Sequence, residues 1–265
     1  MERDSDEKLQ KLIELERKLG EIHDVDVLLD RILTETRKIV NADAGSIYVV
    51  DGDKIIFEGQ EVQNKLRRRI FGPVNEELST PEKLNAITTI WGKLYKTSIV
   101  KGIKFLPLHE LGLCEDGYFN VGILGNVDKA VFIKKHFYHY RKVVSGGSLT
   151  QQKDSNIFEK EKRFYNKLND VIEKEKLPEV YKIALDNRMA ISLIEAGITI
   201  VNSRVNVYKN IKNILKSDEY KNSCKNLTLR YFPVHWKVFF WFAKIRFTFG
   251  ICMLLRIVCI LQKRK

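Results

Sequence analysis

The sequence predicts a mixed α+β protein (α/β in the broad sense), built from pieces of different character. Apolar residues recur with helical spacing near both ends of the chain, and 44% of all residues are hydrophobic, which is enough for a buried core. Two β-rich runs, residues 46–50 and 55–57, flank a turn that contains Asp51 and Gly52, a pattern typical of a β-hairpin. We therefore expect helices combined with short, local strands.

The charge of the chain is distributed unevenly. Residues 1–62 carry sixteen acids and nine bases, whereas residues 200–265 carry fourteen bases and two acids, within a formal net charge of +12. Such asymmetry predicts different surroundings for the two ends. The four cysteines lack disulfide or metal-ligand spacing and the N-terminus is polar, so we expect a cytoplasmic protein.

Residues 1–62 form the first predicted unit. Helical periodicity predicts helices over residues 9–19 and 28–40, ahead of the hairpin. The wording of residues 28–58, LLDRILTETRKIVNADAGSIYVVDGDKIIFE, resembles the opening of a GAF sensor domain, and the resemblance covers residues 8–62. A complete GAF domain is longer, so we expect a partial GAF-like unit of helix, helix and hairpin. An unrelated αα-hairpin with a β-hairpin is the alternative.

A basic stretch, residues 63–71, follows this unit. It holds three consecutive arginines at 67–69, and the helix-breaking pair Gly72 and Pro73 comes directly after it. Basic runs are usually solvated, so we expect a basic linker here rather than a phosphate-binding site.

Six motifs occur in order within residues 72–155. They are WGKLYK at 91–96, FLPL at 105–108, the acidic pair Glu115 and Asp116 with FN at 119–120, an apolar strand at 130–133, FYHYR at 137–141 and SLT at 148–150. This order resembles the acceptor-side half of a family-2 glycosyltransferase. The resemblance extends over residues 72–265 and implies the incomplete C-terminal half of a GT-A-type fold.

The resemblance also implies roles for individual residues. Inverting sugar transfer needs a base that accepts the proton of the acceptor hydroxyl, and a carboxylate can serve. The implied base is Asp116, with Glu115 as its neighbour. The implied substrate-binding residues are Trp91 and Tyr95, which could stack on sugar rings, and Lys93, His139 and Arg141, which could face a diphosphate. Two alternatives stay open: the Glu-Asp-Gly run could be a surface turn, and the aromatic residues could serve apolar packing.

The donor half of such an enzyme has no counterpart in the sequence. The family implies Mg²⁺ or Mn²⁺ held on the donor diphosphate by a D-x-D group. The nearest match, residues 51–53, lies in the turn of the predicted hairpin. We therefore expect no metal site in this chain, and a chimeric or truncated transferase that lacks its donor-binding half.

Residues 156–230 are predicted as a helical extension. One helix has its apolar face at Phe164, Leu168, Val171 and Ile172 and ends near Pro178. A second, over residues 180–200, has the dense apolar pattern of a core helix. A third, polar and basic, is expected over residues 210–226.

Residues 231–265 read as a basic, amphipathic, membrane-facing tail. From Trp236 to Leu261 nearly every residue is apolar or aromatic, but four cations interrupt the run, and the longest uncharged stretch is too short to span a bilayer. We expect residues 236–265 to form a basic, aromatic, amphipathic helix that lies on an anionic membrane surface. Burial in the protein core is the alternative, and nucleic acid is not expected as a partner.

Together these features predict a glycosyltransferase-like protein at the inner face of the cell membrane. Its substrates would be a nucleotide-sugar and a glycan or lipid-linked acceptor. The alternative is a non-enzymatic regulatory or scaffold protein, with a GAF-like unit that forms a homodimer through residues 8–20 and a tail that docks to membrane.

Overall fold

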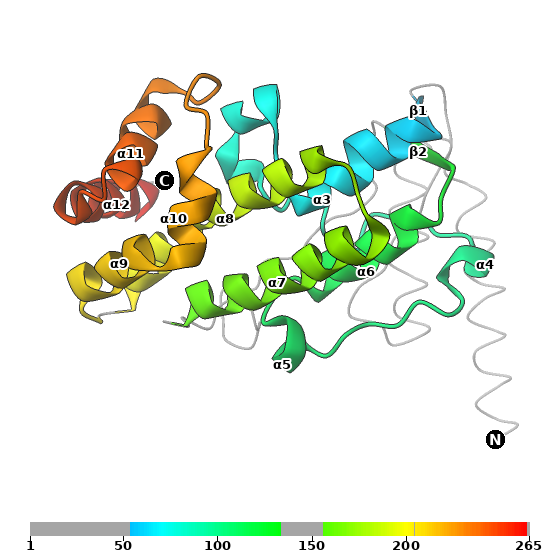
Figure 1. Cartoon of the computed structure of the whole chain (residues 1–265), viewed down its shortest axis with the longest axis horizontal. Coiled ribbons are helices and arrows are strands. Elements are labelled where there is room, and N and C mark those ends of the chain that lie inside the picture. The colour runs from blue at the N-terminus through cyan, green and yellow to red at the C-terminus, as the bar shows by residue number, and fades with distance from the viewer. Residues whose placement is uncertain (1–53, 134–155, 204, 264–265) are drawn as a thin grey trace, which may run out of the picture. The chain divides into compact units, whose positions relative to one another are not determined.

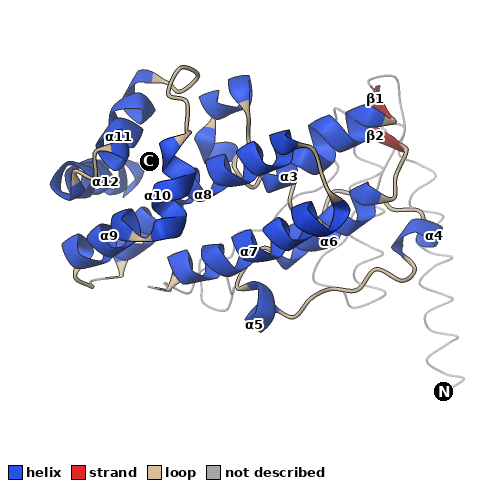
Figure 2. Cartoon of the chain, viewed as in Figure 1, coloured by secondary structure: helices blue, strands red, loops and turns tan. Residues whose placement is uncertain are grey.

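The computed structural model describes residues 54–133, 156–203 and 205–263. Within these ranges the chain is mostly helical, with one two-stranded sheet, as Figures 1 and 2 show. The coarse prediction of a mixed α+β chain is therefore confirmed for the described residues.

Several predictions fall outside those ranges. They are the two helices of residues 1–62, the first strand of the hairpin, the dimer-forming segment 8–20, and the motifs at 137–141 and 148–150. These stay predictions.

The described residues belong to two compact units. Residues 54–55, 91–93 and 131–133 belong to one unit, together with residues outside the described ranges. All other described residues form the second unit, which contains the helices.

The two strands pair with each other. Strand β1 is Lys54–Glu58 and strand β2 is Lys129–Ile133, which confirms the apolar strand expected at 130–133. Just beyond the strands, the Gly59 amide donates to the Asp128 carbonyl at 2.7 Å. The partner of β1 among the described residues is thus far away in sequence.

The segment expected as a basic linker is helical and packed. A helical turn of π type, Val62–Arg67, continues into helix α3, Arg68–Phe71. The guanidinium of Arg67 pairs with Glu175 at 2.8 Å, and that of Arg68 makes two 2.6 Å hydrogen bonds to Glu77. Both arginines are buried because each charge meets a carboxylate and a backbone carbonyl.

Gly72 ends α3 against the backbone of helix α8, Glu179–Asn202. A Cβ atom at this position would stand 1.9 Å from the Ala184 carbonyl oxygen, so only glycine permits the contact. Short elements follow: 3₁₀ turns Asn75–Ser79 and Pro81–Lys83, and helices α4 (Thr97–Val100), α5 (Leu108–Leu111) and α6 (Glu115–Gly125).

Helices α7, Ile157–Glu175, and α8, Glu179–Asn202, form an antiparallel pair (Figure 1). Lys176 closes α7 in the left-handed conformation, and Pro178 opens α8. Buried residues recur every four positions in α7, at Phe164, Leu168 and Ile172, as the periodicity predicts. The predicted core helix at 180–200 is α8, which is buried along most of its length.

Helix α8 contributes residues to two hydrophobic clusters. Its first half packs with α3, α5, α6 and α7, and its second half packs with the four C-terminal helices. These are α9 (Val207–Lys216), α10 (Asp218–Lys225), α11 (Val234–Lys244) and α12 (Thr248–Lys263).

The prediction of a single helix over residues 210–226 is wrong, because the helical conformation is interrupted at Ser217. This residue is extended, and its hydroxyl accepts the Tyr220 amide at 3.4 Å, so it caps the start of α10. The break lets Ile211 and Leu215 of α9 and Tyr220 of α10 all enter the same core.

The tail likewise consists of two helices instead of one. Arg246, with φ 57°, adopts the left-handed conformation between α11 and α12, and the Phe247 amide donates to the Phe242 carbonyl at 2.9 Å. One side of each helix is buried, including Phe239, Phe240 and Leu255. None of the helices in the described ranges is both long and apolar enough to cross a membrane.

Candidate functional site at the start of helix α6

The acidic pair Glu115 and Asp116 lies in the first turn of helix α6. Cys114, immediately ahead, has a left-handed backbone with φ 59°, which turns the chain sharply into the helix. Both carboxylates are half-buried. The Glu-Asp-Gly run is therefore helical and is not the surface turn that its composition also allowed. Carboxylates are favoured at this end of a helix because the first backbone amides point toward them.

Asp116 is held by a neighbouring backbone segment. Its Oδ2 accepts the amide N–H of Ile90 at 3.2 Å. The other oxygen, Oδ1, accepts no hydrogen bond from any described residue. One oxygen thus fixes the side chain, and no described residue occupies the other.

Asn120, one helical turn further along α6, forms hydrogen bonds with the same backbone segment, next to Ile90. Its side chain is 1% exposed, and its Nδ2 donates to the carbonyls of Thr88 at 2.8 Å and Thr89 at 3.1 Å. Its Oδ1 accepts the hydroxyl proton of Tyr95 at 2.6 Å. Because this amide satisfies three partners at once, it fixes both ends of residues 88–95 on α6.

Gly117 allows this close approach. A Cβ atom there would come within 2.8 Å of the Cys114 sulfur and 3.3 Å of the Thr88 Cβ. Thr88 is itself buried, and burial raises the pKa of the Cys114 thiol above its ordinary range. The thiol therefore stays protonated at neutral pH and serves packing rather than nucleophilic chemistry.

Aromatic rings line the flank of the site. Phe119 of α6 stacks on Phe105 with ring centroids 4.1 Å apart and meets Tyr95 edge-on at 6.3 Å. Phe105 is 48% exposed, so one face of this stack is open to solvent. The exposed face of the Phe105 ring is available for contact with a ligand.

The structure brings together three of the seven residues implied by sequence. Glu115 and Asp116 lie in the first turn of α6, and Tyr95 donates a hydrogen bond to Asn120, one turn further along the same helix. Trp91 is 45% exposed and Lys93 half-buried, and both belong to the other compact unit. His139 and Arg141 lie outside the described residues.

Asn120 was part of a motif but had no role assigned from sequence. Its spacing of four from Asp116 was the available signal, because residues four apart share one helix face. Nothing in the sequence indicated that the partners on this face are backbone carbonyls.

The described residues hold no cluster of typical metal ligands. No three histidine, cysteine or carboxylate side chains gather within residues 54–133, 156–203 and 205–263. Asp116 already uses one oxygen for a backbone amide, so the two adjacent carboxylates would hold Mg²⁺ or Mn²⁺ only together with further ligands such as waters or a substrate phosphate.

The chain matches no protein-family model, no curated protein and no solved structure. Functional argument therefore rests on the geometry of the site and on the motifs that the sequence carries.

Proposed function

We propose that residues 72–155 form the acceptor-side part of a sugar-transferring enzyme of GT-A type, and that Asp116 is its catalytic base. The observation that carries the proposal is the fixed, half-buried carboxylate of Asp116, whose Oδ1 accepts no hydrogen bond from the residues that the structure describes. The proposal keeps a partial GAF-like unit for residues 8–62.

In this proposal the acceptor hydroxyl gives its proton to Oδ1 of Asp116. The acceptor oxygen forms a bond to the anomeric carbon, and the bond from that carbon to the donor diphosphate breaks, so the nucleotide leaves with the electron pair. The Phe105 and Phe119 stack and Tyr95 support the acceptor sugar from the side. Glu115 adds negative charge next to the base.

The proposal places the donor site elsewhere. The described residues lack a metal clamp, so no step of the proposed reaction runs through Mg²⁺ or Mn²⁺ held by them. A chain that lacks a donor-binding half would bind acceptor glycans and release nucleotide slowly.

Two readouts test the proposal. The purified chain is titrated with oligosaccharides, with the tryptophan fluorescence as signal, and is incubated with UDP- and GDP-sugars and Mn²⁺ while nucleotide release is followed. Asp116→Asn should leave saccharide binding intact and lower release by about 100-fold or more. Glu110→Gln, an exposed carboxylate on α5, is the matched control and should change neither.

Each result has a definite meaning. Release that survives Asp116→Asn would show that Asp116 is not the base. Absence of both saccharide binding and nucleotide release in the unaltered chain would refute the transferase proposal.

A non-enzymatic scaffold that docks to membranes is the second candidate. It is favoured by one observation, the apolar outer side of the C-terminal helices. That surface can be argued independently of any sugar chemistry.

A further inference from the structure

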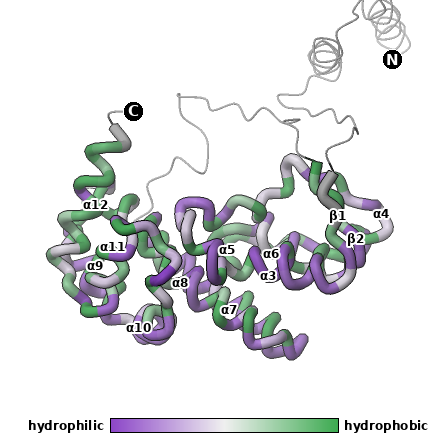
Figure 3. The backbone as a smooth tube through the Cα atoms, turned by 90° about the horizontal axis from the view of Figure 1, so that it is seen from above, coloured by the Kyte–Doolittle hydropathy of each residue, from purple (hydrophilic) through white to green (hydrophobic). Residues whose placement is uncertain are grey.

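Helix α12 carries apolar side chains on both of its sides. Its inner side, which packs on α8 and α9, includes Ile251 and Leu255. Its outer side is spaced three or four residues apart and consists of Phe249, Met253, Ile257, Ile260 and Leu261, each between 45% and 65% exposed. The exposed Arg256 interrupts this outer side. A helix with apolar residues on opposite sides is ordinarily buried or in contact with lipid. Figure 3 shows the hydrophobic colouring along much of this helix.

Helix α11 and the residue after it repeat the pattern. Phe239, Phe240 and Ala243 face the core. The opposite side holds Val234, Val238, Trp241 and Ile245, between 41% and 76% exposed and again three or four residues apart. We call these nine exposed apolar residues of α11, α12 and position 245 the outer apolar surface. Large exposed apolar residues gathered on one side of each helix mark an interaction site.

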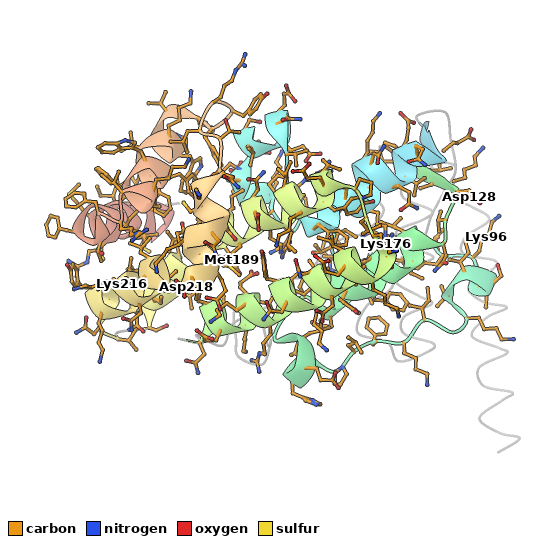
Figure 4. The ribbon with its side chains drawn as sticks, viewed as in Figure 1. Lys96, Asp128, Lys176, Met189, Lys216 and Asp218 are labelled. Atoms are coloured by element: carbon orange, nitrogen blue, oxygen red, sulfur yellow. The ribbon has the colours of Figure 1, made fainter. Side chains whose placement is uncertain are left out.

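Cations gather where the two tail helices meet. Arg246 is exposed at the corner, and beside it lies an open hollow of about 250 Å³. The hollow is lined by Lys212 and Lys216 of α9, by Arg246, and by the rings of Tyr208, Phe247 and Phe249. Figure 4 labels Lys216 at the end of α9. We call this the basic hollow; it shares Phe249 with the outer apolar surface.

The sequence leaves this region without opposing charge. From residue 220 to the end of the chain there are ten lysines and arginines and no aspartate or glutamate. The nearest preceding acids are already paired, Asp218 with Lys221 at 2.7 Å and Glu219 with Lys162 at 2.9 Å. A ligand of the basic hollow must therefore bring its own negative charge.

We propose that the outer apolar surface and the basic hollow together bind an anionic lipid bilayer. The apolar side chains enter the boundary between headgroups and acyl chains, Trp241 lies at headgroup depth, and lipid phosphates meet Lys212, Lys216 and Arg246. The inference does not depend on the proposed sugar transfer.

Other occupants fit less well. A second copy of the chain would bring another set of cations to the same place, and like charges oppose such a contact. Nucleic acid would satisfy the cations but would leave the aliphatic side chains of α12 in water. An anionic bilayer satisfies both the apolar surface and the basic hollow.

Vesicle co-sedimentation of the full chain tests the inference. The chain should partition at least tenfold more strongly onto phosphatidylcholine vesicles with about one third phosphatidylglycerol than onto phosphatidylcholine alone. Arg246→Glu with Lys216→Glu should weaken binding by about tenfold or more, and added salt should weaken the binding of the unaltered chain. Phe249→Ser with Ile257→Ser should weaken it by a similar factor.

Matched controls separate the surface from general effects. Ile183→Ser on α8 replaces an aliphatic residue that is 49% exposed, and Lys174→Glu on α7 reverses an exposed charge. Both should bind vesicles like the unaltered chain, as should Asp116→Asn. Circular dichroism confirms that each variant is folded.

Three results would overturn the inference. These are absence of vesicle binding, equal binding to neutral and anionic vesicles, and a dimer in light scattering that Phe249→Ser with Ile257→Ser converts to monomer while lipid binding persists. Saccharide binding and nucleotide release test the sugar-transfer proposal, whereas vesicle binding tests the membrane proposal. Failure of one proposal is therefore distinguishable from failure of the other.

Discussion

Tyr95 donates its hydroxyl proton to the side-chain oxygen of Asn120 across 2.6 Å. The same amide group donates to the carbonyls of Thr88 and Thr89, so a single buried side chain fixes both ends of an irregular segment. The position of Asp116 depends on this arrangement, because its own partner, the Ile90 amide, belongs to that segment.

Asn120→Ala should therefore destabilise the protein by about 3 kcal/mol, since it removes three hydrogen bonds of a buried side chain. Urea unfolding measures the change. Asn126→Ala is the control: Asn126 is exposed and makes one local hydrogen bond to Gly122, so its loss should cost less than about 0.5 kcal/mol. Equal effects of the two substitutions would contradict the role given to Asn120.

Glu161 predicts a pH dependence of stability. Burial raises the pKa of this carboxyl above its ordinary value of 4.5, and the nearby Arg188 lowers it by less. The folded state thus holds the proton more tightly than the unfolded state. The stabilising contribution is complete below about pH 4.5 and is lost as pH rises through the folded-state pKa.

Glu161→Gln should remove this contribution. The difference in unfolding free energy between the unaltered chain and the variant should fall with rising pH, by at most about 1.4 kcal/mol per pH unit. Urea unfolding in steps of about one pH unit, from roughly pH 4 to pH 8, measures this difference in unfolding free energy. A difference that is constant over this range would show that the pKa of Glu161 is the same in both states.

The local parts of the fold could be predicted from sequence. Apolar residues recur at helical spacing in α7 and in α8, and the helix breaker Pro178 lies between the two helices. These local patterns alone predict the helical pair. The tail shows the limit of such patterns. Its composition predicted an amphipathic surface helix, but the left-handed turn at Arg246 depends on packing of both helices against the core.

The long-range parts could not be predicted in this way. The arginines at 67–69 read as a solvated linker because the carboxylate that pairs with Arg67 lies 108 residues later, at Glu175. At the candidate site, sequence named Glu115, Asp116 and Tyr95, but the partners of Asp116 and of Asn120 include backbone groups of residues 88–90. Every residue has a backbone carbonyl, so the sequence does not indicate which of them accept these hydrogen bonds.

The pair of Arg68 and Glu77 should be worth far more than an exposed ion pair. Arg68 has a 4% exposed side chain and binds both oxygens of Glu77, which also accepts the Val74 amide at 2.9 Å. Glu77→Gln should cost about 2 to 3 kcal/mol because it leaves a buried guanidinium without its counter-charge.

The exposed pair of Lys65 and Glu61 provides the comparison. Its members are 61% and 50% exposed and lie one helical turn apart. Glu61→Gln should cost less than about 0.5 kcal/mol. The result that would count against this argument is a loss at Glu77 as small as the loss at Glu61 when both are measured by thermal unfolding.

Gly72→Ala should be the most damaging of these changes, although it adds only one methyl group. The added Cβ would stand 1.9 Å from the oxygen and 2.7 Å from the carbon of the Ala184 carbonyl, and both atoms belong to the rigid backbone of α8. Helix α3 would have to move away from α8, at a cost of roughly 3 kcal/mol or more. Gly122→Ala is the matched control: it lies within α6, its nearest neighbour would be the Ile103 side chain at 3.3 Å, and alanine favours helix over glycine by about 1 kcal/mol. We expect Gly122→Ala to be neutral or stabilising in urea unfolding, and similar losses at the two positions would contradict the close contact between Gly72 and α8.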